Sequence, residues 1–138
     1  MIRCIMTFVY RWQNDMPEYL ILKRNPTLGG YWQPVTGYID EPETNRYAAL
    51  REFHEETGIV EYERIFDPQH YYFFDMNGIT CSISVLAVEV NNHADVQLSF
   101  EHTAYMWVDY HEAQTMLHWK NNIEALQILH QKLLLTKE

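Results

Sequence analysis

Three glutamates in one short segment carry the most specific chemical signal of the sequence. Glu55 and Glu56 follow Glu52 by three and four positions, in a run that also contains Arg51 and ends at Gly58. On an α-helix, residues three and four positions apart lie on the same face, so the three carboxylates can reach one volume of space. Neighbouring like charges destabilise a bare helix, and divalent cations would neutralise them. The spacing therefore predicts a helix that binds hard metal ions.

The residues around this segment decide between a metal site and a solvated acidic surface. An isolated run of glutamates is usually a solvated helix face. Here the loop residues Gly37 and Glu43 precede the helix, and the whole stretch from Gly37 to Ile59 reads Gly-x5-Glu-x7-Arg-Glu-apolar-x-Glu-Glu-x-Gly-apolar. A pattern with seven fixed identities is far more specific than a lone short motif. The complete pattern therefore favours the metal site.

This pattern is the signature of the Nudix hydrolases, and the sequence resembles that family at every fixed position. The resemblance implies an α/β fold, an α/β/α sandwich with a mixed β-sheet, and hydrolysis of a nucleoside diphosphate linked to another group. It implies that Glu52 and Glu56 bind Mg²⁺ or Mn²⁺, with Glu55 as a further ligand or a contact of metal-bound water. It also implies that Glu43 and Arg51 form an ion pair supporting the helix and its loop.

A second segment resembles one branch of the family, the enzymes that act on dihydroneopterin triphosphate and dATP. Glu101 opens this segment, which extends to Asp109, and is a candidate for a further metal ligand or for the base. The alternative is an ordinary charged residue at the start of a strand. Two stretches, 31–37 and 118–121, resemble the same branch. The candidate contacts to the triphosphate or the base are Arg24, Thr36, His118 and Trp119, against the alternatives of a core tryptophan and a solvated arginine.

The predicted function is a metal-dependent hydrolase that releases a monophosphate and pyrophosphate from a nucleoside triphosphate-like substrate, by attack of water at phosphorus. Other substrates remain open: a diadenosine polyphosphate, a nucleotide sugar or an oxidised dNTP. A second class of function is a sensor that binds a nucleotide without turnover. The complete set of glutamates favours an enzyme, since a pure binding domain has no need of every acid of a metal site.

Other catalytic motifs are absent from the sequence. Neither His54-Glu55 nor His111-Glu112 is followed by a histidine at the spacing of zinc proteases, and no GxxxxGK[ST] phosphate loop occurs. The other five histidines show no ligand spacing, and we expect them at the surface or satisfied in the core.

Composition limits the partners and the compartment. The 138 residues predict a single Nudix domain over residues 1–138, and a formal charge of −9 disfavours binding to nucleic acid or anionic membranes. The sequence shows neither a signal peptide nor a membrane span. Cys4 and Cys81 lack metal-ligand spacing and are expected as buried free thiols, which suits the cytoplasm. A homodimer is possible by the family resemblance.

The elements that must position the site follow from local pattern. Thr44 and Gly58 are predicted to cap the signature helix, where Gly37 lets the loop backbone approach closely. The sheet-facing side of this helix is expected to comprise Tyr47, Ala48, Leu50 and Phe53, with the three glutamates opposite. Strands are expected over 3–10, 19–23, 71–74, 79–90 and 102–109, with an Asn77-Gly78 hairpin turn, and helices over 110–117 and 121–135.

Overall fold

The computed structural model describes residues 1–137; residue 138, the last of the expected domain, lies outside the described residues. The elements are, in chain order, β1 (Ile2–Gln13), β2 (Met16–Arg24), a short 3-10 helix (Pro26–Leu28), β3 (Trp32–Gln33), β4 (Val35–Tyr38), α1 (Asn45–Thr57), β5 (Arg64–Met76), β6 (Ile79–Glu89), β7 (His102–Val108), α2 (Tyr110–Met116) and α3 (Lys120–Leu135). No helix within residues 1–137 is long and apolar enough to cross a membrane.

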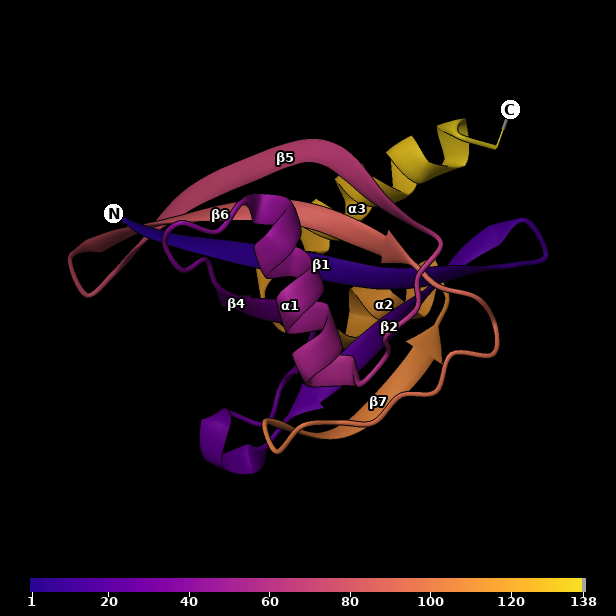
Figure 1. The fold of residues 1–138 in the computed structure, drawn as a ribbon, viewed down its shortest axis with the longest axis horizontal. Helices are drawn as coiled ribbons and strands as arrows, with labels where there is room; N and C mark the ends of the chain where they lie inside the picture. Colours follow the sequence, from indigo (N-terminus) through magenta and orange to yellow (C-terminus); the bar gives the residue numbers. More distant parts are fainter. Residues whose placement is uncertain (138) are drawn as a thin grey trace.

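One mixed sheet forms the centre of the molecule. Its strands run in the order β3-β2-β1-β6-β5, with β4 paired to β1 and β7 paired to β2. β1 and β6 are parallel, and the other pairs are antiparallel. Helix α1 covers one face, and α2 and α3 lie on the other (Figure 1). This arrangement confirms the α/β/α sandwich with a mixed sheet.

Strand β1 supplies buried side chains to both faces of the sheet because successive residues of a strand point in opposite directions. Phe8 and Tyr10 pack in the cluster that includes Leu126 and Leu129 of α3. Val9, on the opposite face, packs in the cluster that includes Phe53 of α1. The two clusters fix the helices on either side of the sheet, so the loops between strands and helices meet at a defined place.

The strands differ from the expected ranges mainly in length. β1 and β2 are longer than the periodic segments, and β3 and β4 are short strands that the sequence did not reveal. β5 begins at Arg64, not at residue 71, since a register shift between Phe66 and His70 interrupts its alternation. The expected turn is confirmed: Asn77 and Gly78 both have positive φ, as a tight hairpin requires.

Helix α1 begins and ends where expected, but its faces differ from the prediction. The Thr44 hydroxyl accepts from the Tyr47 N–H, and Gly58 ends the helix at a φ of 70°. The Tyr47 side chain is exposed (62%), whereas Glu56 is almost fully buried (2%). Both corrections have one cause: the buried stripe passes through residues 49, 53 and 56, at helical spacing, so Glu56 faces the sheet.

Candidate active site

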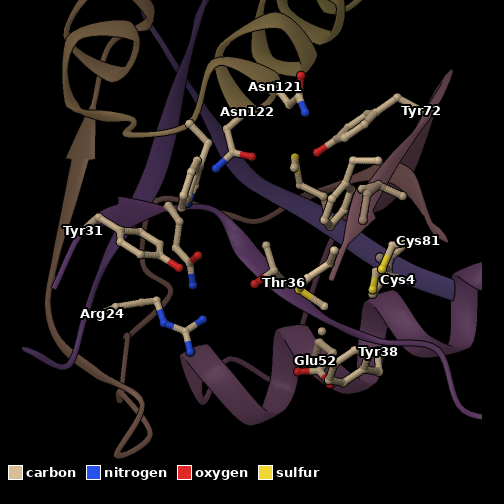
Figure 2. Close-up of a pocket in the computed structure, with 18 of the residues that line it drawn as sticks. Cys4, Arg24, Tyr31, Thr36, Tyr38, Glu52, Tyr72, Cys81, Asn121 and Asn122 are labelled. Atoms are coloured by element: carbon tan, nitrogen blue, oxygen red, sulfur yellow. The ribbon is translucent and has the colours of Figure 1, made fainter. Parts of the chain in front are cut away.

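A cavity of about 830 Å³ opens between the sheet and the start of α3, and we call it the central cavity (Figure 2). Its volume lies in the range of sites for small organic ligands. Residues from both ends of the chain border it. The lining comprises Cys4, Ile5, Met6, Arg24, Tyr31, Gln33, Thr36, Gly37, Tyr38, Glu52, Tyr72, Phe74, Met76, Cys81, Ile83, Glu101, Trp119, Asn121 and Asn122.

Carboxylates from α1 and from the residue before β7 meet at one side of the central cavity. Glu52 and Glu101 border it directly. Glu56, Glu101 and His102 each offer one ligand atom, and these atoms all lie within 4.8 Å of one another. The structure therefore brings Glu101, which is distant in the sequence, close to Glu52 and Glu56 of α1.

Glu56 is the chemically unusual member of this group. Neither of its carboxylate oxygens has a hydrogen-bond partner within the described chain. Burial, together with the neighbouring carboxylates of Glu52 and Glu101, raises the pKa of Glu56 to about 10. A bound cation would oppose this shift and favour the ionised form of Glu56.

The loop before α1 comes into direct contact with this side of the cavity. A Cβ atom at Gly37 would overlap Cδ of Glu52, so the Glu52 side chain would have to move. The absence of a side chain at Gly37 therefore lets the β4 backbone lie against the Glu52 carboxylate. This close approach is the one that we expected from the loop glycine.

Arg51 connects the same loop to α1. Its Nε donates to Glu43 Oε2 at 2.6 Å, and its Nη2 donates to Glu43 Oε1 at 2.9 Å and to the Tyr38 carbonyl at 2.9 Å. Its Nη1 donates to Glu52 Oε1 at 2.7 Å. The guanidinium holds the pKa of Glu43 below its ordinary value. One arginine thus fixes the loop and orients Glu52.

Glu55 lies apart from the other two signature glutamates. Its side chain is 59% exposed, and its Oε2 lies 3.5 Å from Arg51 Nη1. It is neither in the lining of the central cavity nor in the Glu56–Glu101–His102 group. The three acids of the helix therefore occupy three different environments, although their spacing places them on neighbouring positions.

The expected substrate contacts lie in and around the cavity. Arg24 and Thr36 border it, and the Arg24 guanidinium lies 5.9 Å from the ring of Tyr31. Trp119 borders it with one edge toward Tyr31. His118 does not border it but stacks on Tyr31, with ring centroids 5.3 Å apart. Figure 2 shows Arg24 and Tyr31 pointing toward the cavity from the same side.

Several residues of the site escaped the sequence analysis. Tyr72 and Asn122 point into the cavity from β5 and α3 (Figure 2), and burial raises the pKa of the Tyr72 hydroxyl to about 12. His102 corrects our expectation for the remaining histidines, since it belongs to the group that could hold a metal and its Nδ1 has no partner within residues 1–137. The one available signal was its position directly after Glu101.

The donor set fits a divalent metal ion. Hard carboxylate oxygens suit Mg²⁺ and Mn²⁺, and the imidazole of His102 suits transition metals. The unpartnered oxygens of Glu56 and the accumulation of like charge beside Glu52 and Glu101 are the features that a cation would compensate.

Comparison with known proteins decides the family. The model of the NUDIX domain matches residues 4–131. This chain belongs to the Nudix hydrolase family. The Nudix domain is similar in structure to the C. elegans Ap4A hydrolase in a binary complex, with a TM-score of 0.81 and 26% identity over 96% of this chain and 98% of that one. The prediction of a Nudix hydrolase fold is confirmed.

Curated relatives carry different names. The bis(5'-nucleosyl)-tetraphosphatase [asymmetrical] of C. elegans is 30% identical over 107 residues, covering 76% of this Nudix chain and 77% of that protein. The dihydroneopterin triphosphate diphosphatase of E. coli K12 is 29% identical over 140 residues and covers 91% of each chain. An octanoyltransferase of Myxococcus xanthus is 33% identical over 119 residues, but this chain spans only 30% of its length.

Proposed function

We propose that this Nudix protein hydrolyses a nucleoside triphosphate-like substrate, of the dATP or dihydroneopterin triphosphate type, to a monophosphate and pyrophosphate. The observation that carries the proposal is the central cavity, which has carboxylates at one side and aromatic and amide side chains at the other. A substrate of this type has the same two halves, a polyphosphate and a heterocycle. The E. coli relative named as a dihydroneopterin triphosphate diphosphatase supports this choice.

The acids have distinct roles in this proposal. Glu52, Glu56 and Glu101 would hold Mg²⁺ or Mn²⁺, and Glu55 would contact a water ligand of the ion from the exposed side. A divalent ion would supply Lewis acidity to the phosphoryl oxygens and lower the pKa of an attacking water. Glu101 would also accept a proton from that water, which its position at both the cavity and the Glu56–Glu101–His102 group supports.

The remaining lining residues bind and orient the substrate. In this proposal the Arg24 guanidinium binds the triphosphate, which is supported by its Nε having no partner among the described residues. Thr36 offers a hydroxyl at the centre of the cavity (Figure 2). The amides of Asn121 and Asn122 bind the heterocycle, which lies between aromatic side chains. His118 and Trp119 support this aromatic side through their contacts with Tyr31.

A second candidate substrate is a dinucleoside polyphosphate. It is favoured by the structural similarity to the C. elegans Ap4A hydrolase and by the relatives named as asymmetrical tetraphosphatases. Both candidates share the metal site and differ only in what lies beyond the phosphates. The proposal also includes action as one domain and a cytoplasmic location, in keeping with the free thiols Cys4 and Cys81. A homodimer remains a family-based proposal.

A substrate panel with Mg²⁺ or Mn²⁺ tests the proposal. The panel contains dATP, dihydroneopterin triphosphate, diadenosine tetraphosphate, a nucleotide sugar and an oxidised dNTP, with products identified by chromatography. We expect pyrophosphate from the first two and its loss in Glu56→Gln. Turnover of diadenosine tetraphosphate alone would select the second candidate. Nucleotide binding by the wild type without turnover of any substrate would contradict the proposal and favour a sensor.

A further inference from the structure

The imidazole of His102 lies next to the carboxylate of Glu56. Its Nε2 is 3.7 Å from Glu56 Oε1, and its side chain has no exposed surface. The register of β7 on β2 places His102 opposite Arg24, beside a register shift that follows Lys23. Unlike Glu52 and Glu101, His102 does not border the central cavity. Glu56 does not border it either, so the contact between His102 and Glu56 lies outside the cavity lining.

An ionised Glu56 needs a hydrogen-bond donor at this position. Two buried oxygens without partners are costly, and the cost is greatest when the group carries a charge. A metal ion bound by one of these oxygens would leave the other without a partner. The nitrogen of His102 at 3.7 Å is a suitable neighbour to supply one after a small adjustment.

The contacts of His102 favour a proton on Nε2. Its Nδ1 faces no partner within the described residues, whereas Nε2 faces both Glu56 and the Gln33 amide, whose nitrogen lies 3.3 Å away. A glutamine amide can exchange its nitrogen and oxygen by a half-turn, so Gln33 can accept from the same N–H group. Gln33 then fixes the ring.

We infer that His102 is a positioning residue, whose Nε2–H donates to Glu56 and holds the ionised carboxylate in the orientation that binds a metal ion. Gln33 supports the ring by accepting from the same N–H. The inference rests on the metal-binding role proposed for Glu56. Donors behind a ligating carboxylate commonly contribute 10-fold to 100-fold to metal affinity. His102 therefore sets how tightly the site binds its ion, without touching the substrate.

The test compares two variants of similar size. His102→Gln keeps an N–H donor at the end of the side chain, and His102→Leu removes it. The dissociation constant for Mn²⁺ is measured without substrate, from the electron paramagnetic resonance signal of free Mn²⁺. We expect about 10-fold to 100-fold weaker binding by His102→Leu, and binding by His102→Gln within about threefold of the wild type. Circular dichroism and thermal unfolding in EDTA check that each variant is folded.

A second measurement uses the unmodified protein and does not depend on a folded variant. Electron spin echo modulation of bound Mn²⁺ should lack the strong nitrogen coupling of a directly bound imidazole. Strong coupling would overturn the inference, because His102 would then be a ligand. Wild-type affinity in His102→Leu, or equal weakening in both variants, would also overturn it. A wild type that binds no Mn²⁺ would instead contradict the proposed metal site as well.

Discussion

Glu43 and Glu56 belong to the same sequence signature, but the fold treats them in opposite ways. Glu43 accepts from Arg51 with both oxygens and from the backbone N–H of Asp40. Glu56 has no hydrogen-bond partner for either oxygen within residues 1–137. The pKa of Glu43 is lowered and that of Glu56 is raised. A satisfied carboxylate stabilises the free protein, whereas an unsatisfied one is kept for a ligand.

The two environments arise from position relative to the sheet. Glu43 lies in the loop before α1, where the long side chain of Arg51 can reach it. Glu56 lies on the buried stripe of α1, where the sheet excludes water. The fixed identities of one motif therefore divide into residues that hold the loop and residues that we propose to bind the ion. Substitutions can separate these two kinds of contribution.

The largest expected effect is on turnover in Glu56→Gln. The amide keeps the size of the side chain but removes the charge that holds the metal, so kcat should fall by about 100-fold or more. Glu43→Gln keeps the acids at the cavity and should lose much less activity at temperatures where it is folded. Steady-state kinetics with saturating Mg²⁺ provide the measurement. Equal losses in the two variants would remove the distinction between them.

The second largest effect is on stability in Arg51→Met. This change removes the donors to Glu43, Glu52 and the Tyr38 carbonyl, and we expect a loss of about 2 kcal/mol in the free energy of unfolding. Urea unfolding in EDTA measures this loss. Arg46→Met is the matched control, since Arg46 is exposed on the same helix. Arginine and methionine have similar helix propensities, so neither exchange should change the stability of the helix by itself. A similar loss in the control would show that the hydrogen bonds of Arg51 contribute little to stability.

The two carboxylates should also give opposite pH dependence in EDTA. The pKa of Glu56 in the folded protein, about 10, is above its ordinary value of 4.5, so its contribution favours folding below pH 4.5 and is lost as the pH rises toward 10. The slope is about 1.4 kcal/mol per pH unit for one group. Glu43, with a lowered pKa, instead loses its contribution as the pH falls through its folded value.

Urea unfolding across this range, with Glu56→Gln as the comparison, measures the first slope. Between pH 5 and 9, the free energy of unfolding of the variant should change less with pH than that of the wild type. Identical slopes would show that Glu56 is ionised in the metal-free protein.

The smallest effect is expected in Glu55→Gln. Its exposed carboxylate contributes to a surface ion pair with Arg51, which is worth less than about 1 kcal/mol. Because the Glu55 carboxylate is proposed to contact metal-bound water, its loss should lower kcat by about tenfold. This decrease is much smaller than the one expected in Glu56→Gln. The same kinetic assay compares the two variants. A loss as large as that of Glu56→Gln would make Glu55 a direct ligand.

The family resemblance implied the sandwich, whereas local pattern predicted the signature helix, its Thr44 and Gly58 caps and the Asn77-Gly78 turn. These features depend on residues a few positions apart, whose effect on the backbone does not need the rest of the fold. The short strands β3 and β4 were missed because two to four residues give no period to recognise. Their existence depends on pairing with β2 and β1.

The buried partners of the site could not be found in the same way. Gln33, His102 and Asn122 come from β3, β7 and α3, and only the strand register and helix packing bring them near the signature helix. The burial of Glu56 was missed for a related reason. A glutamate is seldom placed on the core side of a helix by its own preference, and here the requirements of the site override that preference.

The walls of the central cavity come from both ends of the chain, from Cys4 of β1 to Asn122 of α3. A molecule bound there would contact several strands of the sheet and helix α3 at the same time. A molecule that binds the folded state stabilises it and therefore raises the melting temperature of the protein. Melting temperature in the presence of single compounds can therefore rank nucleotides and pterins for this protein before any reaction product is measured.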